Sequence, residues 1–467
     1  MSFLSRFFSH KKSKSKGSSA NYKKSSAETY KDERKLFLKK ERAKEKSAAS
    51  ARTSYISELS LQGQPDKAIF AVSDNDFSKA FSGIILSDDL HYDNNIVISD
   101  DKDDRLLQLI RTSVGSDYLP DTIFSRGEFK YFKNRFLQHA GIAKTEASFC
   151  QMYTDWLFFC KDAGYDMDDY FDYEFYNKDF QTRFSFVSAS FRENLRRKLN
   201  VNFNILAKKN LFLETFRDFI KRPWLDCNVC TLDEFKSFCR ETPVFFSKSE
   251  QGFGGAGVRK LSLSESQAEE MYPQLQAQNC VVEAPVIQHS AISEFNSSTV
   301  NTIRVMTVAD ANDDIIISNA AIRFGRKDSF ADNYHQGGVC ASVDPTNGII
   351  NSDAIDITGA HFTCHPDSGK VFRGFEIPCW DVLRDTVTSA ALSCKESVRI
   401  VGWDIAITSD GDIDFIEGNS RPGFDILQAP NMTGLKKLYL DITSGLVTEE
   451  ELTDVSKGYW RKWPLPI

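Results

Sequence analysis

The second half of the chain predicts an α+β or α/β fold with several antiparallel strand pairs. From about residue 201 onward, short apolar runs rich in β-branched residues alternate with segments of helical spacing. The chain has 467 residues and a hydrophobic content of 41%, which is enough for two or three domains with at least one large core. Its net charge of −7 gives the molecule as a whole no basic field for nucleic acid.

The expected elements of this half follow from residue type and periodicity. Strands are expected where apolar, often β-branched residues run together, at residues 244–247, 258–263, 280–283, 300–309, 315–324, 399–408 and 412–417. Helices are expected where apolar residues recur with helical spacing, at residues 204–220, 232–240, 265–275 and 380–395.

Composition divides the chain into four parts. Residues 1–55 predict a basic low-complexity tail, disordered or partly helical, because few large apolar residues follow Phe8. Residues 56–200 predict a mixed, partly helical α/β domain. Residues 201–430 form the predicted α+β domain, and residues 431–467 a C-terminal helical extension.

The mixed domain holds two kinds of segment. Short apolar runs lie at 72–87 and 95–98, and helical spacing recurs at 129–136, 147–163 and 184–198. A further segment, residues 165–179, is packed with aromatic and acidic residues. We interpret its aromatic residues as packing residues, because the neighbouring acids would repel phosphate groups.

The N-terminal tail allows two interpretations, a solvated tail or a membrane-surface anchor. Four apolar residues can share one face of a helix, and five basic residues follow them: Phe3, Leu4, Phe7 and Phe8, then His10, Lys11, Lys12, Lys14 and Lys16. The tail is not a secretory signal, since its apolar part is too short. We therefore expect a cytoplasmic protein, with peripheral contact at the inner face of the membrane as the second interpretation.

Ten cysteines are scattered along the chain without the spacing of a disulfide framework. Cys227 and Cys230 form one CxxC pair, and Cys239 follows. A zinc site needs a fourth ligand of similar spacing, and none stands out in the sequence. We interpret these residues as reduced core or surface thiols.

The strongest chemical signal is a hairpin of residues 402–423. Asp410 and Gly411 favour a two-residue loop because both tolerate positive φ. With that loop, Asp404 pairs with Glu417, and paired residues point to the same face with Cβ atoms about 4.5–5.5 Å apart. Asn419 shares that face.

Two carboxylates held this close repel each other unless a cation lies between them. Mg²⁺ prefers hard oxygen ligands and fills its other positions with water and phosphate. The hairpin therefore predicts that Asp404, Glu417 and Asn419 form a metal–polyphosphate site. Asp412 and Asp414 are interpreted as incidental acids of a surface hairpin.

A second signal is a lysine followed by a glycine-rich loop. Lys248 ends an apolar strand, and the loop that follows contains Gly252, Gly254, Gly255 and Gly257. Glycines let backbone N–H groups approach a phosphate, and a lysine adds a point charge. The same glycines are equally typical of a mobile hairpin that binds no phosphate.

Two further strands carry single charged residues. Glu283 ends an apolar strand and is either an adenine or ribose contact or an exposed strand end. Arg304 lies within an apolar strand, so it either binds a carboxylate or phosphate or forms an internal salt bridge. Arg323 is a second candidate of the same kind.

The order of these motifs resembles the ATP-grasp superfamily. More narrowly, it resembles the sugar-transfer-associated ATP-grasp group. The resemblance covers roughly residues 200–430. The phrases that carry it lie at residues 281–289, 298–307, 333–348, 365–380 and 402–428. It implies an ATP-grasp fold, in which two α+β lobes grip ATP.

The resemblance implies roles for residues of the nucleotide side. Lys248 would contact the ATP phosphates beside the loop that holds Gly254, Gly255 and Gly257. Lys209, or its neighbour Lys208, would be an earlier ATP lysine. The adenine hinge would be formed by Glu283 and Ile287.

It also implies roles on the metal side. Asp404, Glu417 and Asn419 would bind Mg²⁺, and Arg304 would steady the transferred phosphoryl group. The turn at Gly337 and Gly338 would approach the substrate carboxylate.

The resemblance implies an ATP- and Mg²⁺-dependent carboxylate–amine ligase that acts through an acyl phosphate. Its substrates would be an amine and the carboxylate of a sugar acid or amino acid in surface polysaccharide biosynthesis. Two alternatives stay open. One is a phosphotransferase with His289 or His335 as phosphate acceptor, and the other is a nucleotide-binding scaffold of a polysaccharide assembly complex.

Overall fold

The computed structural model describes residues 103–114, 126–160, 163–249, 257–326 and 332–455. The basic tail and the apolar runs at 72–87 and 95–98 lie outside the described residues. Gly252, Gly254 and Gly255 also lie outside them.

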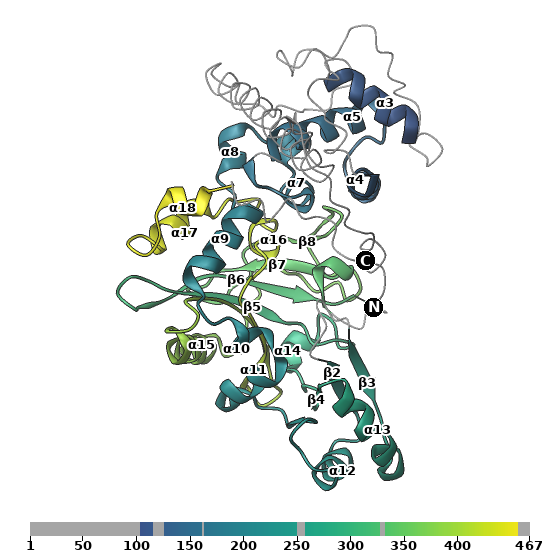
Figure 1. Ribbon diagram of the computed structural model, residues 1–467, viewed down its shortest axis with the longest axis vertical. Helices are drawn as coiled ribbons and strands as arrows, with labels where there is room; N and C mark the ends of the chain where they lie inside the picture. Colours follow the sequence, from purple (N-terminus) through teal and green to yellow (C-terminus); the bar gives the residue numbers. More distant parts are fainter. Residues whose placement is uncertain (1–102, 115–125, 161–162, 250–256, 327–331, 456–467) are drawn as a thin grey trace, which may run out of the picture. The chain divides into compact units, whose positions relative to one another are not determined.

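The described part of the N-terminal domain is helical, in agreement with the periodicity of residues 129–198 (Figure 1). Its helices are α3 (Asp103–Val114), α4 (Arg126–Gln138), α5 (Glu146–Asp155), the π-helical η2 (Trp156–Cys160), α7 (Met167–Asp172), the 3₁₀ turn η3 (Phe175–Asn177), α8 (Phe180–Phe184) and α9 (Ala189–Leu199). The single helix expected over 184–198 is split because the Ser188 hydroxyl caps α9 by accepting from the Phe191 amide.

The aromatic residues of segment 165–179 are packing residues, as predicted. Tyr165, Tyr170, Phe171, Tyr173 and Phe175 are all buried. These rings provide much of the apolar area that holds the short helices together.

A seven-stranded antiparallel sheet dominates the second half, with strand order β11-β10-β5-β6-β7-β8-β9 (Figure 1). Its strands are β5 (Ile303–Ala309), β6 (Ile315–Phe324), β7 (Val339–Val343), β8 (Ala354–Asp356), β9 (His361–Phe362), β10 (Ile400–Ile407) and β11 (Ile413–Asn419). β5, β6, β10 and β11 were predicted. β7 was missed because it is buried on both faces and its sequence, VCASV, shows no alternation.

A smaller four-stranded sheet has the order β1-β4-β2-β3. Its strands are β1 (Trp224–Asp226), β2 (Phe245–Ser249), β3 (Val258–Leu261) and β4 (Cys280–Glu283), and it is accompanied by α12 (Leu232–Glu241) and α13 (Glu265–Ala277). Phe235 and Phe238 of α12 pack with Phe245 and Val282 in a core of their own. Each sheet therefore has its own hydrophobic core, as expected for a two-lobed fold.

Shorter helices connect these parts. They are α10 (Asn204–Ala207), α11 (Lys209–Thr215), η4 (Arg217–Phe219), α14 (Ser290–Ser293), η5 (Tyr334–Gln336), α16 (Asp425–Gln428), α17 (Lys436–Ile442) and α18 (Glu449–Thr453). The single helix expected over 204–220 is interrupted at Lys208, whose backbone is extended. Helices α17 and α18 lie within residues 431–467, the predicted C-terminal helical extension, of which the structure describes residues 431–455.

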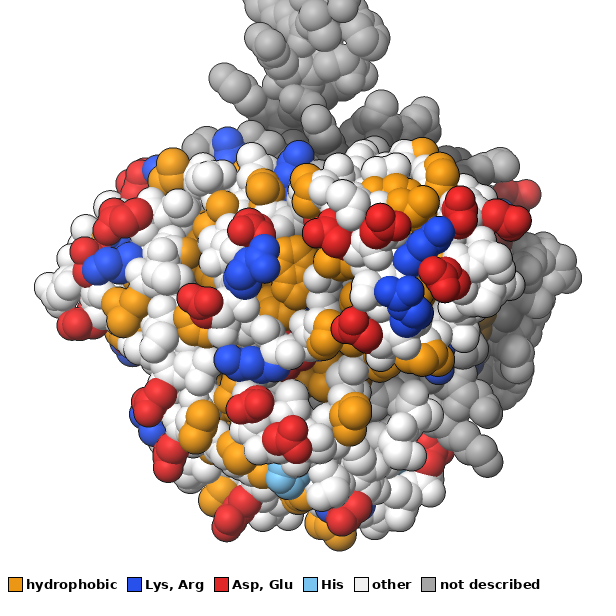
Figure 2. Space-filling view, turned by 90° about the horizontal axis from the view of Figure 1, so that it is seen from below, with side chains coloured by type: hydrophobic (Ala, Val, Ile, Leu, Met, Phe, Trp, Pro, Cys, Tyr) orange, Lys and Arg blue, Asp and Glu red, His pale blue; other side chains and the backbone are white. Residues whose placement is uncertain are grey.

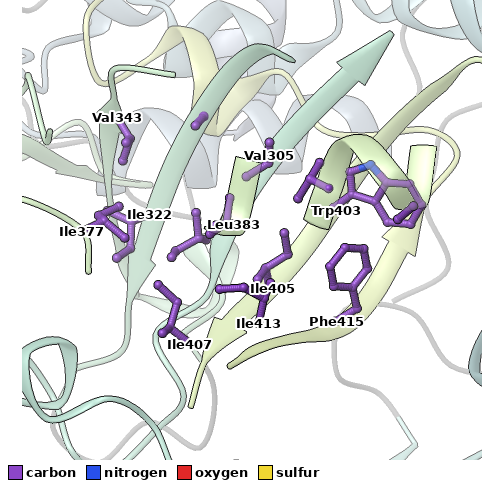
Figure 3. Close-up of a cluster of buried hydrophobic side chains, with 14 of the residues drawn as sticks. Val305, Ile322, Val343, Ile377, Leu383, Trp403, Ile405, Ile407, Ile413 and Phe415 are labelled. Carbon is purple, nitrogen blue, oxygen red and sulfur yellow. The ribbon is translucent and has the colours of Figure 1, made fainter. Parts of the chain in front are cut away.

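In the strands of the large sheet, successive side chains point to opposite faces. Val305, Trp403 and Ile405 belong to one hydrophobic core, which also contains Leu383 of α15 (Trp380–Cys394) (Figure 3). The alternate residues, Arg304 and Asp404, therefore point to the opposite face. One face of β5 and β10 is hydrophobic core, and the other carries the charged residues that the sequence singled out.

Substitution of Trp403 tests how much this core contributes to the stability of the fold. Its indole is fully buried, and its Nε1 donates to Thr307 Oγ1 at 2.9 Å. Trp403→Ala is expected to lower the free energy of unfolding by about 3–5 kcal/mol. Val382→Ala, at a position on α15 that is 55% exposed, is the control and should change it by less than about 0.5 kcal/mol. Urea unfolding measures both, and equal midpoints would contradict this assignment of the core.

Candidate functional site

Asp404 is the central charged residue of the face opposite the core. It is 1% exposed. Arg304 binds it with two contacts, Nε to Oδ1 at 2.6 Å and Nη2 to Oδ2 at 3.0 Å. Arg323 adds a third contact, Nη2 to Oδ2 at 3.2 Å. Burial would raise the pKa of Asp404, but the two guanidinium groups outweigh burial and hold that pKa well below its usual range.

Glu417 pairs with Asp404 across β10 and β11, as predicted, but the path of the hairpin differs from the prediction. Thr408 N–H donates to Asp412 O at 2.9 Å, so the loop has three residues rather than two. Ile405 pairs with Phe415, and the register then shifts by one residue before Asp404 pairs with Glu417.

The extra residue is Ile416, which forms a β-bulge. In an uninterrupted strand Glu417 would share the core face with Ile413 and Phe415. The bulge turns Glu417 and Asn419 to the face of Asp404. The longer loop and the bulge therefore compensate each other, and the predicted pair forms.

Asn419 joins the two carboxylates. Its Nδ2 lies 3.3 Å from Asp404 Oδ2 and 3.3 Å from Glu417 Oε1. Withdrawal from water, and then the charge of Asp404, raise the pKa of Glu417, although part of the Glu417 side chain stays exposed. A further cation at this point would relieve that repulsion.

The donor set fits a magnesium ion. Two carboxylates and one amide, which can rotate to present its oxygen, are hard ligands that leave positions for water and phosphate. Within the described ranges, no group of three or more His, Cys, Asp or Glu side chains forms a metal cluster. A site of two acids and one amide would therefore depend on ligands from outside the protein to complete it.

A second charged cluster connects the small sheet to the hairpin. Arg222 Nε donates to Glu283 Oε2 at 2.7 Å, and Arg222 Nη1 donates to Asp414 Oδ1 at 2.6 Å. Lys248 Nζ also donates to Glu283 Oε2, at 2.9 Å. Burial would raise the pKa of Glu283, but Arg222 and Lys248 outweigh it and lower the pKa to about 2.

This cluster corrects two expectations. Asp414 is not an incidental surface acid, because it is fully buried and paired with Arg222. Glu283 is not an exposed strand end either, since it is 3% exposed. Sequence reasoning missed Arg222; the signal was an arginine two residues before a strand that pairs with the strand of Glu283.

The segment after Glu283 is attached to the hairpin loop. Ser409 N–H donates to Ile287 O at 2.7 Å, and His289 N–H donates to Ile407 O at 2.9 Å. The Gln288 amide exchanges hydrogen bonds with the buried Asn301. Ile287 itself is 73% exposed. The predicted hinge thus runs from the small sheet to the large one.

The other predicted nucleotide residues lie at the end of β2. Lys209 Nζ donates to Ser249 O at 3.0 Å, so the first residue of α11 contacts the last residue of β2. Ser249 N–H donates to Gly257 O at 3.3 Å and closes the base of the glycine-rich loop. Gly257 has a φ of +85°, which favours glycine.

The predicted substrate turn lies beside an ion pair. His335 Nε2 is 2.8 Å from Asp425 Oδ2, and Gly337 has a φ of +92°. A Cβ on Gly338 would meet the carbonyl oxygen of Asp332 at 2.6 Å. Glycine at 338 therefore allows the turn to fold back on itself.

A family comparison gives the site its context. Residues 232–443, somewhat less than half of the chain, match the family model described as sugar-transfer associated ATP-grasp. Residues 232–443 form an ATP-grasp domain of this type. The domain contains β2 to β11, and the predicted family and fold are confirmed.

Solved structures similar to the chain are ATP-grasp ligases. The ligase PsnB with its minimal precursor is 15% identical, with 56% of this chain and 64% of that chain covered and a TM-score of 0.33. D-alanyl-alanine synthetase A from Vibrio cholerae is 14% identical, with 52% and 66% covered and a TM-score of 0.33. N5-carboxyaminoimidazole ribonucleotide synthetase is 12% identical, with 47% and 46% covered and a TM-score of 0.30.

The chain covers less than two thirds of each of these solved chains. No protein of curated function matches it. The domains outside residues 232–443 therefore have no counterpart in the family match.

The buried pair of Arg222 and Asp414 is expected to stabilise the ATP-grasp domain. Asp414→Ala would leave a buried guanidinium without one of its two carboxylates, at a cost of about 3–5 kcal/mol. Asp412→Ala changes an exposed acid of the same hairpin and should cost less than about 0.5 kcal/mol. Denaturant unfolding of the two variants provides the measurement, and similar losses would show that Asp414 has no special role.

The pair of His335 and Asp425 predicts a pH dependence. The His335 side chain is about half exposed. Its partial withdrawal from water would lower its pKa, but the hydrogen bond and charge of the Asp425 carboxylate outweigh this effect and raise that pKa to about 9. Because the folded value lies above the unfolded value of about 6.5, this contribution to stability is complete below about pH 6.5 and is lost as the pH rises through about 9.

Histidine NMR titration measures the shift. In Asp425→Asn the pKa of His335 should fall towards about 6.5, and the loss of stability between neutral and alkaline pH should be smaller than in the parent chain. A His335 pKa that is the same in both proteins would exclude Asp425 as the cause.

Proposed function

We propose that the chain is an ATP- and Mg²⁺-dependent ligase that activates a carboxylate as an acyl phosphate and joins it to an amine. The observation that supports this proposal most is the convergence of Asp404, Glu417 and Asn419 on the charged face of the large sheet. Arg304 and Arg323 lie directly beside them. Two acids, one amide and two guanidinium groups suit a magnesium ion and a phosphoryl group in transfer.

Asp404, Glu417 and Asn419 would hold Mg²⁺ in this proposal. Bound there, the ion would neutralise charge on the terminal phosphates of ATP. Lys248, Lys209 and the glycine-rich loop would hold the phosphates from the small sheet. Glu283 anchors Lys248 and Arg222 through ion pairs, so its carboxylate supports the proposed nucleotide site by positioning these cations.

Arg304 would steady the transferred phosphoryl group. Its guanidinium keeps a fixed plane because two of its nitrogens bind the Asp404 carboxylate. A substrate carboxylate would attack the γ-phosphate in line, and ADP would leave. An amine would then displace phosphate from the acyl phosphate, so positioning and charge provide most of the catalysis.

The substrate class is proposed from the family description, which names an association with sugar transfer. We propose a carboxylate of a sugar acid or amino acid used in surface polysaccharide biosynthesis, and a small or saccharide-borne amine. On the face shown in Figure 2, basic and acidic side chains are interspersed among the described residues, which suits a small substrate better than a nucleic acid. In the part of the chain described here, every helix is too short or too polar to cross a membrane.

A histidine phosphotransferase is less well supported. Asp425 raises the pKa of His335, so that imidazole is protonated at neutral pH and lacks the lone pair that an attack on phosphate needs. His289 uses its Nδ1 to accept the Ala291 amide at the start of α14. Phosphohistidine after incubation with labelled ATP would nevertheless support this alternative.

ADP release tests the proposed ligase. The chain is incubated with ATP, Mg²⁺, uronic acids or amino acids, and a panel of amines. ADP formation that requires both a carboxylate and an amine is expected. ATP hydrolysis that is indifferent to every amine would contradict amide formation.

Glu417→Gln tests the metal site. Loss of one charged ligand is expected to lower ADP formation on the order of 100-fold. Asp412→Asn, at an exposed acid of the same hairpin, should leave the rate unchanged. If Glu417→Gln abolishes turnover but not assembly with polysaccharide enzymes, an enzyme is supported, whereas a chain without turnover in any form would support the scaffold.

A further inference from the structure

The CxxC pair lies at a defined position in the small sheet. Strand β1 ends at Asp226, Cys227 follows directly, and helix α12 begins two residues after Cys230. Within this turn the N–H groups of Val229 and Cys230 both donate to Asp226 O, at 3.1 Å and 3.0 Å. This turn begins at Asp226, so Cys227 is its second residue and Cys230, three positions later, is its fifth.

Both ends of this turn are fixed by neighbouring elements. Cys227 N–H donates to Cys280 O on β4 at 3.1 Å. The Tyr272 hydroxyl of α13 donates to Cys230 O. The side chains of Cys227 and Cys230 lie within hydrogen-bonding range of each other. The turn therefore brings the two sulfur atoms together, as disulfide formation requires.

The two thiols differ in exposure and ionisation. Cys227 is fully buried, whereas Cys230 is partly exposed. A hydrogen bond from the Cys227 thiol, against the opposing effect of burial, lowers the pKa of Cys230. The same contact, together with burial, raises the pKa of Cys227. Cys230 is thus the more accessible and more readily ionised of the two thiols, as an attacking thiol must be, and Cys227 has the position of a resolving thiol.

The other partly exposed cysteines lack such a neighbour in sequence. Cys364 and Cys379 have no cysteine within three residues on either side. They provide natural controls within the same chain.

We propose that Cys227 and Cys230 form a reversible thiol–disulfide site that reacts with low-molecular-weight disulfides such as oxidised glutathione. This site is separate from the charged face of the large sheet and does not depend on the proposed ligase activity. Pairs of this kind in reducing compartments are usually transient and redox-sensing.

The exchange takes place in two steps. The Cys230 thiolate attacks one sulfur of the glutathione disulfide, forms a mixed disulfide and expels a glutathione thiolate, which takes up a proton. Cys227 then loses its proton to solvent and attacks Cys230 Sγ, which releases the second glutathione. The protein loses two electrons and two protons, and one glutathione disulfide becomes two glutathione thiols.

The full-length chain is treated with oxidised glutathione at neutral pH, and free thiols are then alkylated. Cleavage after Lys221 and Lys236 yields a peptide that contains both thiols and no other cysteine. In most of the chains, this peptide is expected to carry no alkyl group and to be lighter by two hydrogen atoms than the reduced, unalkylated peptide. Treatment with dithiothreitol before alkylation should reverse the change. Two reduced thiols, or glutathione bound at Cys230 without closure, would overturn the proposal.

Two variants check the roles of the thiols. Cys227→Ser should trap glutathione on Cys230 as a stable mixed disulfide, since no thiol remains to resolve it. Cys230→Ser should leave Cys227 reduced. If the buried Cys227→Ser fails to fold, the rate of alkylation in the parent chain decides: Cys230 should react faster than Cys364 and Cys379, and an equal rate would count against an activated thiol.

Discussion

The buried charge of Asp404 is the constraint on which the site depends. An ionised carboxylate removed from water is stable only when cations and hydrogen bonds surround it. Arg304 on β5 and Arg323 on β6 provide them, so three adjacent strands must stay in register. The strand order of the large sheet and the geometry of the charged face therefore depend on each other.

The cluster around Arg222 extends this requirement to the small sheet. Arg222 contacts Glu283 at the end of β4 and Asp414 on β11, so one guanidinium connects both lobes. The hinge segment runs beside it and is attached to the hairpin loop through Ile287 and His289. The small and large sheets are therefore connected by a buried ionic contact as well as by a short stretch of backbone.

The charged face of the large sheet could be predicted from the sequence. The two-residue period of the strands and the charged residues within them both indicated the same side of the sheet. Arg304 and Asp404 each interrupt an apolar strand at a position where the alternation points away from the core. Strand β7 could not be found in this way, since burial on both faces removes the alternation. Asp414 and Arg222 were missed for a different reason: their pairing joins residues 192 positions apart in sequence, and only the tertiary fold brings them together. The helices of residues 129–198 were recognised, but the break before α9 depends on the Ser188 cap.

The bulge at Ile416 has a consequence for the comparison of related chains. The third residue of the loop and the extra residue of the bulge each shift the register between β10 and β11. The two shifts cancel, so Asp404 still pairs with Glu417. A relative with a two-residue loop and a regular second strand would pair the same two carboxylates with the same number of residues between them. A structural alignment of the two chains should then place one gap at the bulge, between Phe415 and Glu417, and a compensating gap at the loop. An alignment without gaps would match a residue of the charged face, such as Asp414, with a core residue of the relative.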